Sequence, residues 1–178
     1  MKRPIFRYSL SCLFGLFVLC NSCKKLEQLF AFTISNQSSV TIPSSSPVNL
    51  PVDIATPNVT SNSSQEFKNN NTNVNLVKNI TLQSLQLSIT SPSNQTFNFL
   101  QSIHIYISTN SSNEIELAYL DQIPANVNLI GLIPTQASLD QYVKASSYNL
   151  RTTVVTSQIL TQNVNINVDS KFRVTASL

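Results

Sequence analysis

Apolar residues alternate with polar ones through most of the second half of the chain, and this alternation constrains the fold more than any other feature. Ile103, Ile105 and Ile107 lie at every second position, and the same spacing recurs over residues 148–154 and 164–176. A period of two is typical of a strand that buries one face. The polarity in between comes mainly from Asn, Ser, Thr and Gln, since charged residues make up only 11% of the chain. The sequence therefore predicts an all-β fold.

The number and length of these strands indicate the architecture. About eight short strands are predicted, and turn-forming residues separate them, for example at 91–94 and 110–113. Many short strands favour two packed layers, so we expect an immunoglobulin-like β-sandwich. The likeness is one of architecture only. The chain contains no tryptophan and so lacks the Cys…Trp…Cys pattern of true immunoglobulin domains.

The inward phase of the strands defines a predicted core. It comprises Leu82, Leu87, Ile103, Ile105, Ile107, Leu117, Leu129, Leu150, Val154, Val164, Ile166 and Phe172. The phase changes between Leu82 and Leu85, which predicts a β-bulge near residues 83–84. Gly131 suggests a second bulge or a close backbone approach. Residues 36–39 are predicted to form a turn, since Asn and Ser are turn formers.

Residues 43–75 are the least regular part of the chain. Prolines are spread through its first half and disfavour a helix there: Pro43, Pro47, Pro51 and Pro57. Apolar residues between Val48 and Val59 mostly alternate, which predicts that part of the segment packs as an edge strand. Residues 61–75 are predicted to be a loop. Whether the whole segment packs or forms a flexible stalk stays open.

One short helix is predicted near residues 138–145. Ser138 and Gln141 have the spacing of a capping box, in which the serine caps the first turn and the glutamine reaches back to it. Leu139 and Tyr142 then lie at helical spacing.

The N-terminus has the organisation of an export signal. Three basic residues, Lys2, Arg3 and Arg7, precede a short apolar run over residues 9–20, and a small residue then stands directly before Cys23. The run is too short for a membrane-spanning helix, which needs about 20 apolar residues.

The segment Leu19-Cys20-Asn21-Ser22-Cys23 resembles the lipobox of bacterial lipoproteins, and the lysines that follow make it similar to Bacteroidota lipoproteins in particular. It departs from the strict pattern because Cys20 stands at the usual leucine position. The resemblance implies that residues 1–22 are a cleaved signal peptide and that Cys23 carries lipid such as palmitate. Residues 23–29 would be a tether and 30–178 a single domain. An ordinary signal peptide with a chance cysteine is the alternative.

The resemblance also implies a location. Lys24 follows Cys23, whereas an aspartate at that position often retains such lipoproteins in the inner membrane. We therefore expect an outer-membrane lipoprotein of the bacterial cell envelope, with periplasmic or surface facing left open. The membrane would be the partner through Cys23, and a protein or glycan partner stays open.

Cleavage would also change the charge. The chain has 11 basic and 8 acidic residues. Removing three basic residues with the signal leaves 11 − 3 = 8 against 8, so the net charge falls to zero. The apparent basicity therefore gives no support to a nucleic-acid partner, which requires a basic patch. Cys23 would be acylated and Cys12 and Cys20 removed, so the mature domain is expected to hold no disulfide and no cysteine metal site.

Few residues suggest chemistry. His104 is the only histidine and lies on the polar phase of its strand, where a surface role is expected. Glu114 and Glu116 share one face, with Asp121 nearby. Such carboxylates could hold calcium or act as acid and base, but a charged edge that blocks strand pairing is the commoner arrangement. We expect no catalytic residue, no cofactor and no metal site.

The sequence therefore favours a non-enzymatic, lipid-anchored protein with a structural or interaction role. A glycan-binding accessory or adhesion module is an alternative, because the ring of Tyr106 is out of phase with the core isoleucines. A hydrolase that uses His104 or the pair Glu114 and Glu116 is a further alternative.

Overall fold

The alternating segments form an antiparallel sheet in a computed structural model, which describes residues 31–176. The strands are β1 (Ala31–Ile42), β2 (Pro51–Ala55), β3 (Val59–Thr60), β4 (Val77–Ser91), β5 (Leu100–Ser108), β6 (Ile115–Leu120), β7 (Leu129–Pro134), β8 (Ser147–Thr156) and β9 (Val164–Ala176). The helices are α3 (Ser63–Asn69), the 3₁₀ turn η2 (Phe97–Phe99) and α4 (Asp140–Val143). The all-β prediction is confirmed, with nine strands in this part of the chain rather than about eight.

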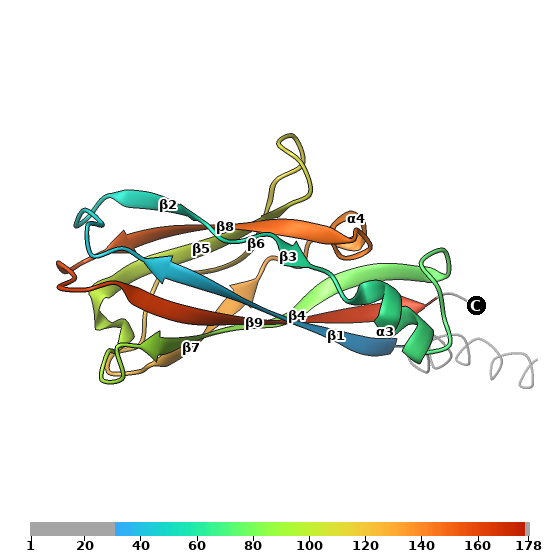
Figure 1. The fold of residues 1–178 in the computed structure, drawn as a ribbon, viewed down its shortest axis with the longest axis horizontal. Coiled ribbons are helices and arrows are strands. Elements are labelled where there is room, and N and C mark those ends of the chain that lie inside the picture. The colour runs from blue at the N-terminus through green and yellow to red at the C-terminus, as the bar shows by residue number, and fades with distance from the viewer. Residues whose placement is uncertain (1–30, 177–178) are drawn as a thin grey trace, which may run out of the picture.

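The sheet is curled, and its strand order is β1-β9-β4-β7-β6-β5-β8-β2, with β3 paired to β8 (Figure 1). Strand β7 joins the two halves because its start pairs with β4 and its end, Ile133 and Pro134, pairs with β6. In the core the ring of Tyr148 on β8 packs edge to face against that of Phe172 on β9, with ring centroids 6.3 Å apart. Strands β1 and β2 are the two ends of the sheet.

The core follows the predicted strand phases. Eleven of the twelve predicted core residues are buried, and the side chains of Ile103, Ile105 and Ile107 are fully so. The predicted bulge near 83–84 is confirmed, because the register of β4 against β9 shifts between Leu82 and Ser84.

Two predictions about β7 were wrong. The side chain of Leu129 is 53% exposed, and Ile130 is buried in its place. The strand register explains this exchange. Leu87 of β4 points into the core and lies opposite Ile130, so Ile130 rather than Leu129 points inward from β7. Gly131 marks neither a bulge nor a close approach. It pairs regularly with Gln86, and a Cβ added there would meet nothing within 4 Å.

The predicted turn at 36–39 was also wrong, since those residues continue β1 in unbroken register with β9. In the next segment the edge-strand prediction is confirmed by β2, but α3 replaces part of the loop predicted over 61–75. Helix α3 forms because Phe67 is buried against Phe32 of β1, with ring centroids 6.2 Å apart. Tertiary packing of one aromatic side chain thus outweighs a weakly helical local sequence.

The predicted helix near 138–145 is present as α4, although it is not the only α-helix in residues 31–176. The capping box was wrong, because Leu139 is the N-cap and makes no side-chain cap bond. The carboxylate of Asp140 instead accepts hydrogen bonds from the Ser138 hydroxyl at 3.0 Å and from the Ile80 N–H at 3.1 Å. It thereby fastens the short helix to β4.

Candidate functional site

Two polar regions of the described chain could support a function, and the first lies on the outer face of strands β2, β8, β5 and β6. Cross-strand register places Asp53, Thr153, His104 and Tyr119 in one row across these four strands. We call this region the outer-face network. It consists of Asp53, His104, Tyr106, Glu114, Glu116, Tyr119, Asp121, Arg151 and Thr153.

His104 lies between two carboxylates. Its Nδ1 is 2.6 Å from Glu116 Oε1, and its Nε2 is 3.0 Å from Asp121 Oδ1. The imidazole ring also stacks on that of Tyr119, with centroids 5.8 Å apart and planes 18° from parallel. The side chain of His104 is 29% exposed. The predicted surface position is thus only partly right, because the ring is held on both sides rather than free.

The two carboxylates determine the charge of His104. Neutral imidazole carries one N–H, but both ring nitrogens of His104 face carboxylate oxygens. An ionised carboxylate accepts hydrogen bonds and cannot donate them, so both nitrogens need a proton. Partial burial acts to lower the pKa of His104, whereas the hydrogen bonds and charges of Glu116 and Asp121 act to raise it. The carboxylates prevail, so the pKa is raised above its ordinary value and the imidazolium form is favoured.

Arg151 joins the other half of the network. Its Nη2 donates to Glu114 Oε1 at 2.6 Å and its Nη1 to Asp53 Oδ1 at 2.7 Å, while the guanidinium carbon lies 4.2 Å from the centre of the Tyr106 ring. Hydrogen bonds to Glu114 raise the pKa of Arg151 further, so it stays charged. A hydrogen bond from the Thr153 hydroxyl, helped by Arg151, lowers the pKa of Asp53.

The structure separates the two glutamates that the sequence placed together, since Glu114 binds Arg151 and Glu116 binds His104. It also adds Tyr119, whose position two residues after the inward Leu117 predicts an inward ring. The register of β5 against β6 skips Leu117, so this bulge turns Tyr119 outward beside His104. No signal in β6 alone reveals a bulge that is defined by its partner strand.

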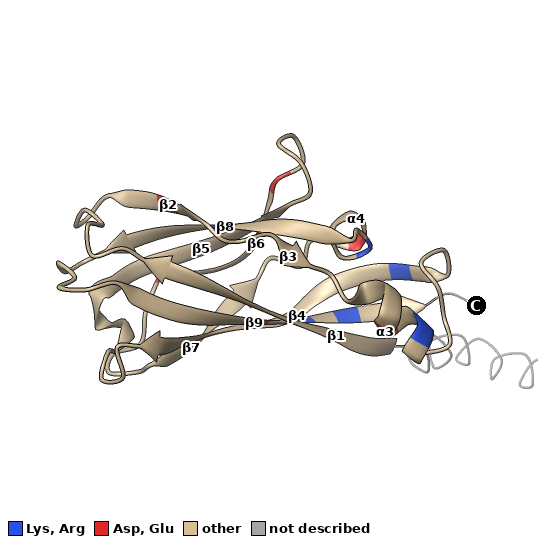
Figure 2. Cartoon of the chain, viewed as in Figure 1, with Lys and Arg blue, Asp and Glu red and all other residues tan. Residues whose placement is uncertain are grey.

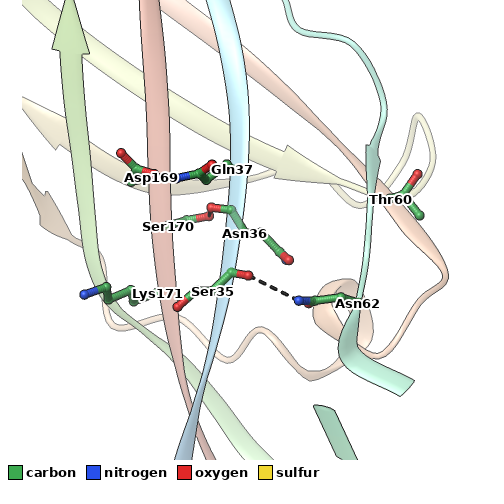
Figure 3. A pocket seen from close by; sticks show the side chains of 8 residues that line it. All are labelled: Ser35, Asn36, Gln37, Thr60, Asn62, Asp169, Ser170 and Lys171. Atoms are coloured by element: carbon green, nitrogen blue, oxygen red, sulfur yellow. Dashed lines mark hydrogen bonds between the residues drawn. The ribbon is translucent and has the colours of Figure 1, made fainter. Parts of the chain in front are cut away.

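The second polar region is a cleft of about 480 Å³ between β1 and the segment that joins β3 to α3 (Figure 3). We call it the seam cleft. It is lined by Ser35, Asn36, Gln37, Thr60, Asn62, Asp169, Ser170 and Lys171. The side chain of Asn62 bridges the two walls, because its Nδ2 donates to the backbone oxygen of Ser35 at 3.3 Å.

Asn36 is one of two buried residues of the seam cleft, the other being Ser170. Asn36 is only 7% exposed, and its Nδ2 donates to the Tyr148 hydroxyl at 3.0 Å. Burial raises the pKa of Tyr148, so that hydroxyl stays protonated. Among residues 31–176, none donates a hydrogen bond to Asn36 Oδ1, and Figure 3 shows the side chain directed toward the gap in front of Thr60 and Asn62.

Two arrangements that the sequence suggested, a metal-binding cluster and a platform of free aromatic rings, are not formed by residues 31–176. Within the described residues no group of three His, Cys, Asp or Glu side chains is placed to hold a metal ion. The faces of the outer aromatic rings are engaged, since Tyr119 stacks on His104 and Tyr106 lies under Arg151. A platform of free coplanar rings, the arrangement expected of the glycan-binding alternative, is therefore not formed by this part of the chain.

Charge is sparse elsewhere on the domain. Figure 2 shows that the lysines and arginines in view gather toward the end that holds α3 and α4. Cys23 lies outside the described residues. None of the helices over residues 31–176 is long and apolar enough to cross a membrane.

Comparisons with known proteins do not assign the chain to a family. No protein-family profile and no curated protein matches it. Solved structures give weak likenesses, among them Desmodium yellow mottle tymovirus at 13% identity, covering 83% of each chain with a TM-score of 0.30. A structure of FLHE shares 8% identity over 82% of this chain and 98% of its own, with a TM-score of 0.31. Turnip yellow mosaic virus shares 11% over 83% and 94%, with a TM-score of 0.27. Scores this low carry no argument about function.

Proposed function

We propose that the chain is a lipid-anchored protein of the bacterial cell envelope and that its β domain binds a partner rather than catalysing a reaction. The observation that carries the anchor is the sequence itself. Basic residues, a short apolar run and Ser22-Cys23 follow one another in the order of a lipoprotein signal. Strand β1 begins at Ala31, so a short tether would connect Cys23 to the end of the domain that holds α3 (Figure 1).

The outer-face network supports a role without catalysis. A general base needs a free nitrogen or oxygen within reach of a substrate proton. Both ring nitrogens of His104 already face carboxylates, and Glu114 is held by Arg151. These contacts favour a network that stabilises the strands and presents a fixed surface over one that transfers protons.

The finer architecture belongs to this proposal. The two halves of the curled sheet would act as the two layers of an immunoglobulin-like β-sandwich, the common scaffold for surface recognition. Contact between Tyr148 and Phe172 across the core supports two facing layers. Nuclear Overhauser effects between these two rings would test the packing, and their absence would contradict it.

The anchor is tested with the cysteines of the chain. Cells that produce wild type, Cys23→Ser or the matched control Cys12→Ser, which lies outside the lipobox, are fed labelled palmitate and fractionated. We expect label and outer-membrane localisation in wild type and in Cys12→Ser, and loss of both in Cys23→Ser. Two acyl chains or more give stable anchoring at about 0.8 kcal/mol per buried CH₂. A Cys23→Ser protein that keeps label and membrane association would refute the anchor.

A further inference from the structure

The seam cleft contains an accessible hydrogen-bond acceptor. Asn36 Oδ1 receives no hydrogen bond from residues 31–176 and stays open to the cleft, although most of the residue is buried. Water can satisfy such an acceptor, and a ligand hydroxyl can replace that water. The cleft gives access to this oxygen, and a molecule in the cleft could supply the missing donor.

The lining defines the chemistry of such a molecule. All eight lining side chains are polar, so the cleft offers nothing to an apolar ligand. The cleft has no net charge, because it holds one cation, Lys171, and one anion, Asp169. It therefore favours neither an anionic nor a cationic ligand. The charge of Asp169 is also partly compensated, because its two oxygens accept hydrogen bonds from Gln37 Nε2 at 2.6 Å and Asn167 Nδ2 at 2.7 Å.

The shape of the cleft argues against an extended peptide. A peptide added along the free edge of β1 would need to pass the hydrogen bond that joins Asn62 to Ser35. A compact ligand would not break that bond, and a cleft of about 480 Å³ lies within the size range of small-molecule sites.

We propose that the seam cleft binds a neutral, polyhydroxylated ligand, a unit of one or two sugars, with one hydroxyl donating to Asn36 Oδ1. Sugar hydroxyls both donate and accept, which matches a wall of amides and hydroxyls. Because no aromatic ring lines the cleft, binding is weak, with a Kd on the order of 1 mM. This goes beyond the anchoring role, and the two can fail separately.

The test uses the full chain as cells produce it, purified in detergent micelles and labelled with ¹⁵N. It is titrated with the neutral probes cellobiose, maltose and chitobiose, and with glucuronic acid, glucosamine and a Gly-Ser dipeptide. We expect a neutral disaccharide to shift the side-chain amide signals of Asn36, Gln37 and Asn62. Asn36→Ala should abolish binding. Thr60→Val and Asn62→Ala are exposed changes that leave the core intact, and each should weaken binding roughly 3- to 10-fold, the effect of one neutral hydrogen bond.

Asn58→Ala is the matched control, because Asn58 is an exposed asparagine that bonds Asn149 outside the cleft. Its affinity should equal that of wild type. No shift with any neutral sugar, equal binding by wild type, Thr60→Val and Asn62→Ala, or a preference for the acid, the amine or the dipeptide would each overturn the proposal. The purified protein is used throughout, so failure of the anchor would not change these results.

Discussion

The outer-face network and the seam cleft are both polar, but they differ in how far their polar groups pair with one another. In the network each ionised group faces an opposite charge, as His104 does Glu116 and Arg151 does Glu114. In the cleft the walls are mostly neutral, and Asn36 holds an acceptor that no residue of the described chain satisfies. Polar groups that pair with one another stabilise the sheet, whereas an accessible acceptor without a protein donor can bind a ligand. This difference is the basis for our proposal that recognition resides in the cleft and strand stability in the network.

The largest expected effect tests the separation between the outer face and the core. Ile105 is fully buried, while its neighbour His104 lies on the outer face. Ile105→Asp places an unpaired carboxylate in the core and should unfold the domain or nearly so, against a total stability of about 5–15 kcal/mol. His104→Ala should cost less than about 1 kcal/mol. Circular dichroism during urea denaturation measures both. A severe His104→Ala with a mild Ile105→Asp would show that the strand phase is inverted.

The strand phases could be predicted because a period of two is a local property. The bulge near 83–84 is visible as a phase change within β4 itself, whereas the bulge at Leu117 exists only relative to β5. His104 and Glu116 could therefore be recognised from the sequence, whereas the alternation of β6 alone predicts the wrong face for Tyr119.

The seam cleft was missed for a different reason. Asparagine is a common turn former, and the local sequence around Asn36 predicts a turn. Its actual partners are Tyr148 and Ser170, which lie more than a hundred residues away along the chain. Only the curling of the sheet brings β1 close to β8 and to Asn62. Sites made by the approach of distant strands leave no trace in local periodicity.

A smaller effect tests the inner wall of the cleft. Asn36→Ala removes the hydrogen bond to the Tyr148 hydroxyl, which keeps its hydrogen bond with Ser170, and should cost about 1 kcal/mol. Tyr148→Phe removes the other partner, and the double variant should be less destabilised than the sum of the two. A double-mutant cycle by urea denaturation gives this coupling free energy. Strictly additive losses would mean that the bond contributes nothing and that Asn36 is held by other contacts.

The smallest expected effect tests whether His104 stabilises the network only in its charged form. The pKa of His104 is raised from its ordinary value of 6.5 in the folded protein, because Glu116 and Asp121 outweigh the effect of burial. The ion pairs of His104 with Glu116 and Asp121 therefore stabilise the fold fully below pH 6.5. This stabilisation is lost as the pH rises through the folded-state pKa of His104.

The other charges near the ring, on Arg151 and Asp53 in strands β8 and β2, bind each other and do not titrate in this range. His104→Gln should accordingly be less stable than wild type by up to about 1 kcal/mol at pH 5.5, with the gap closing toward pH 9. Urea denaturation of both proteins across this range measures the gap. Asp121→Asn is the matched control, and it should retain a reduced pH dependence because Glu116 remains. A gap that is constant, or that widens with rising pH, would mean that His104 is neutral and that the network, like the cleft, contains an unmet partner.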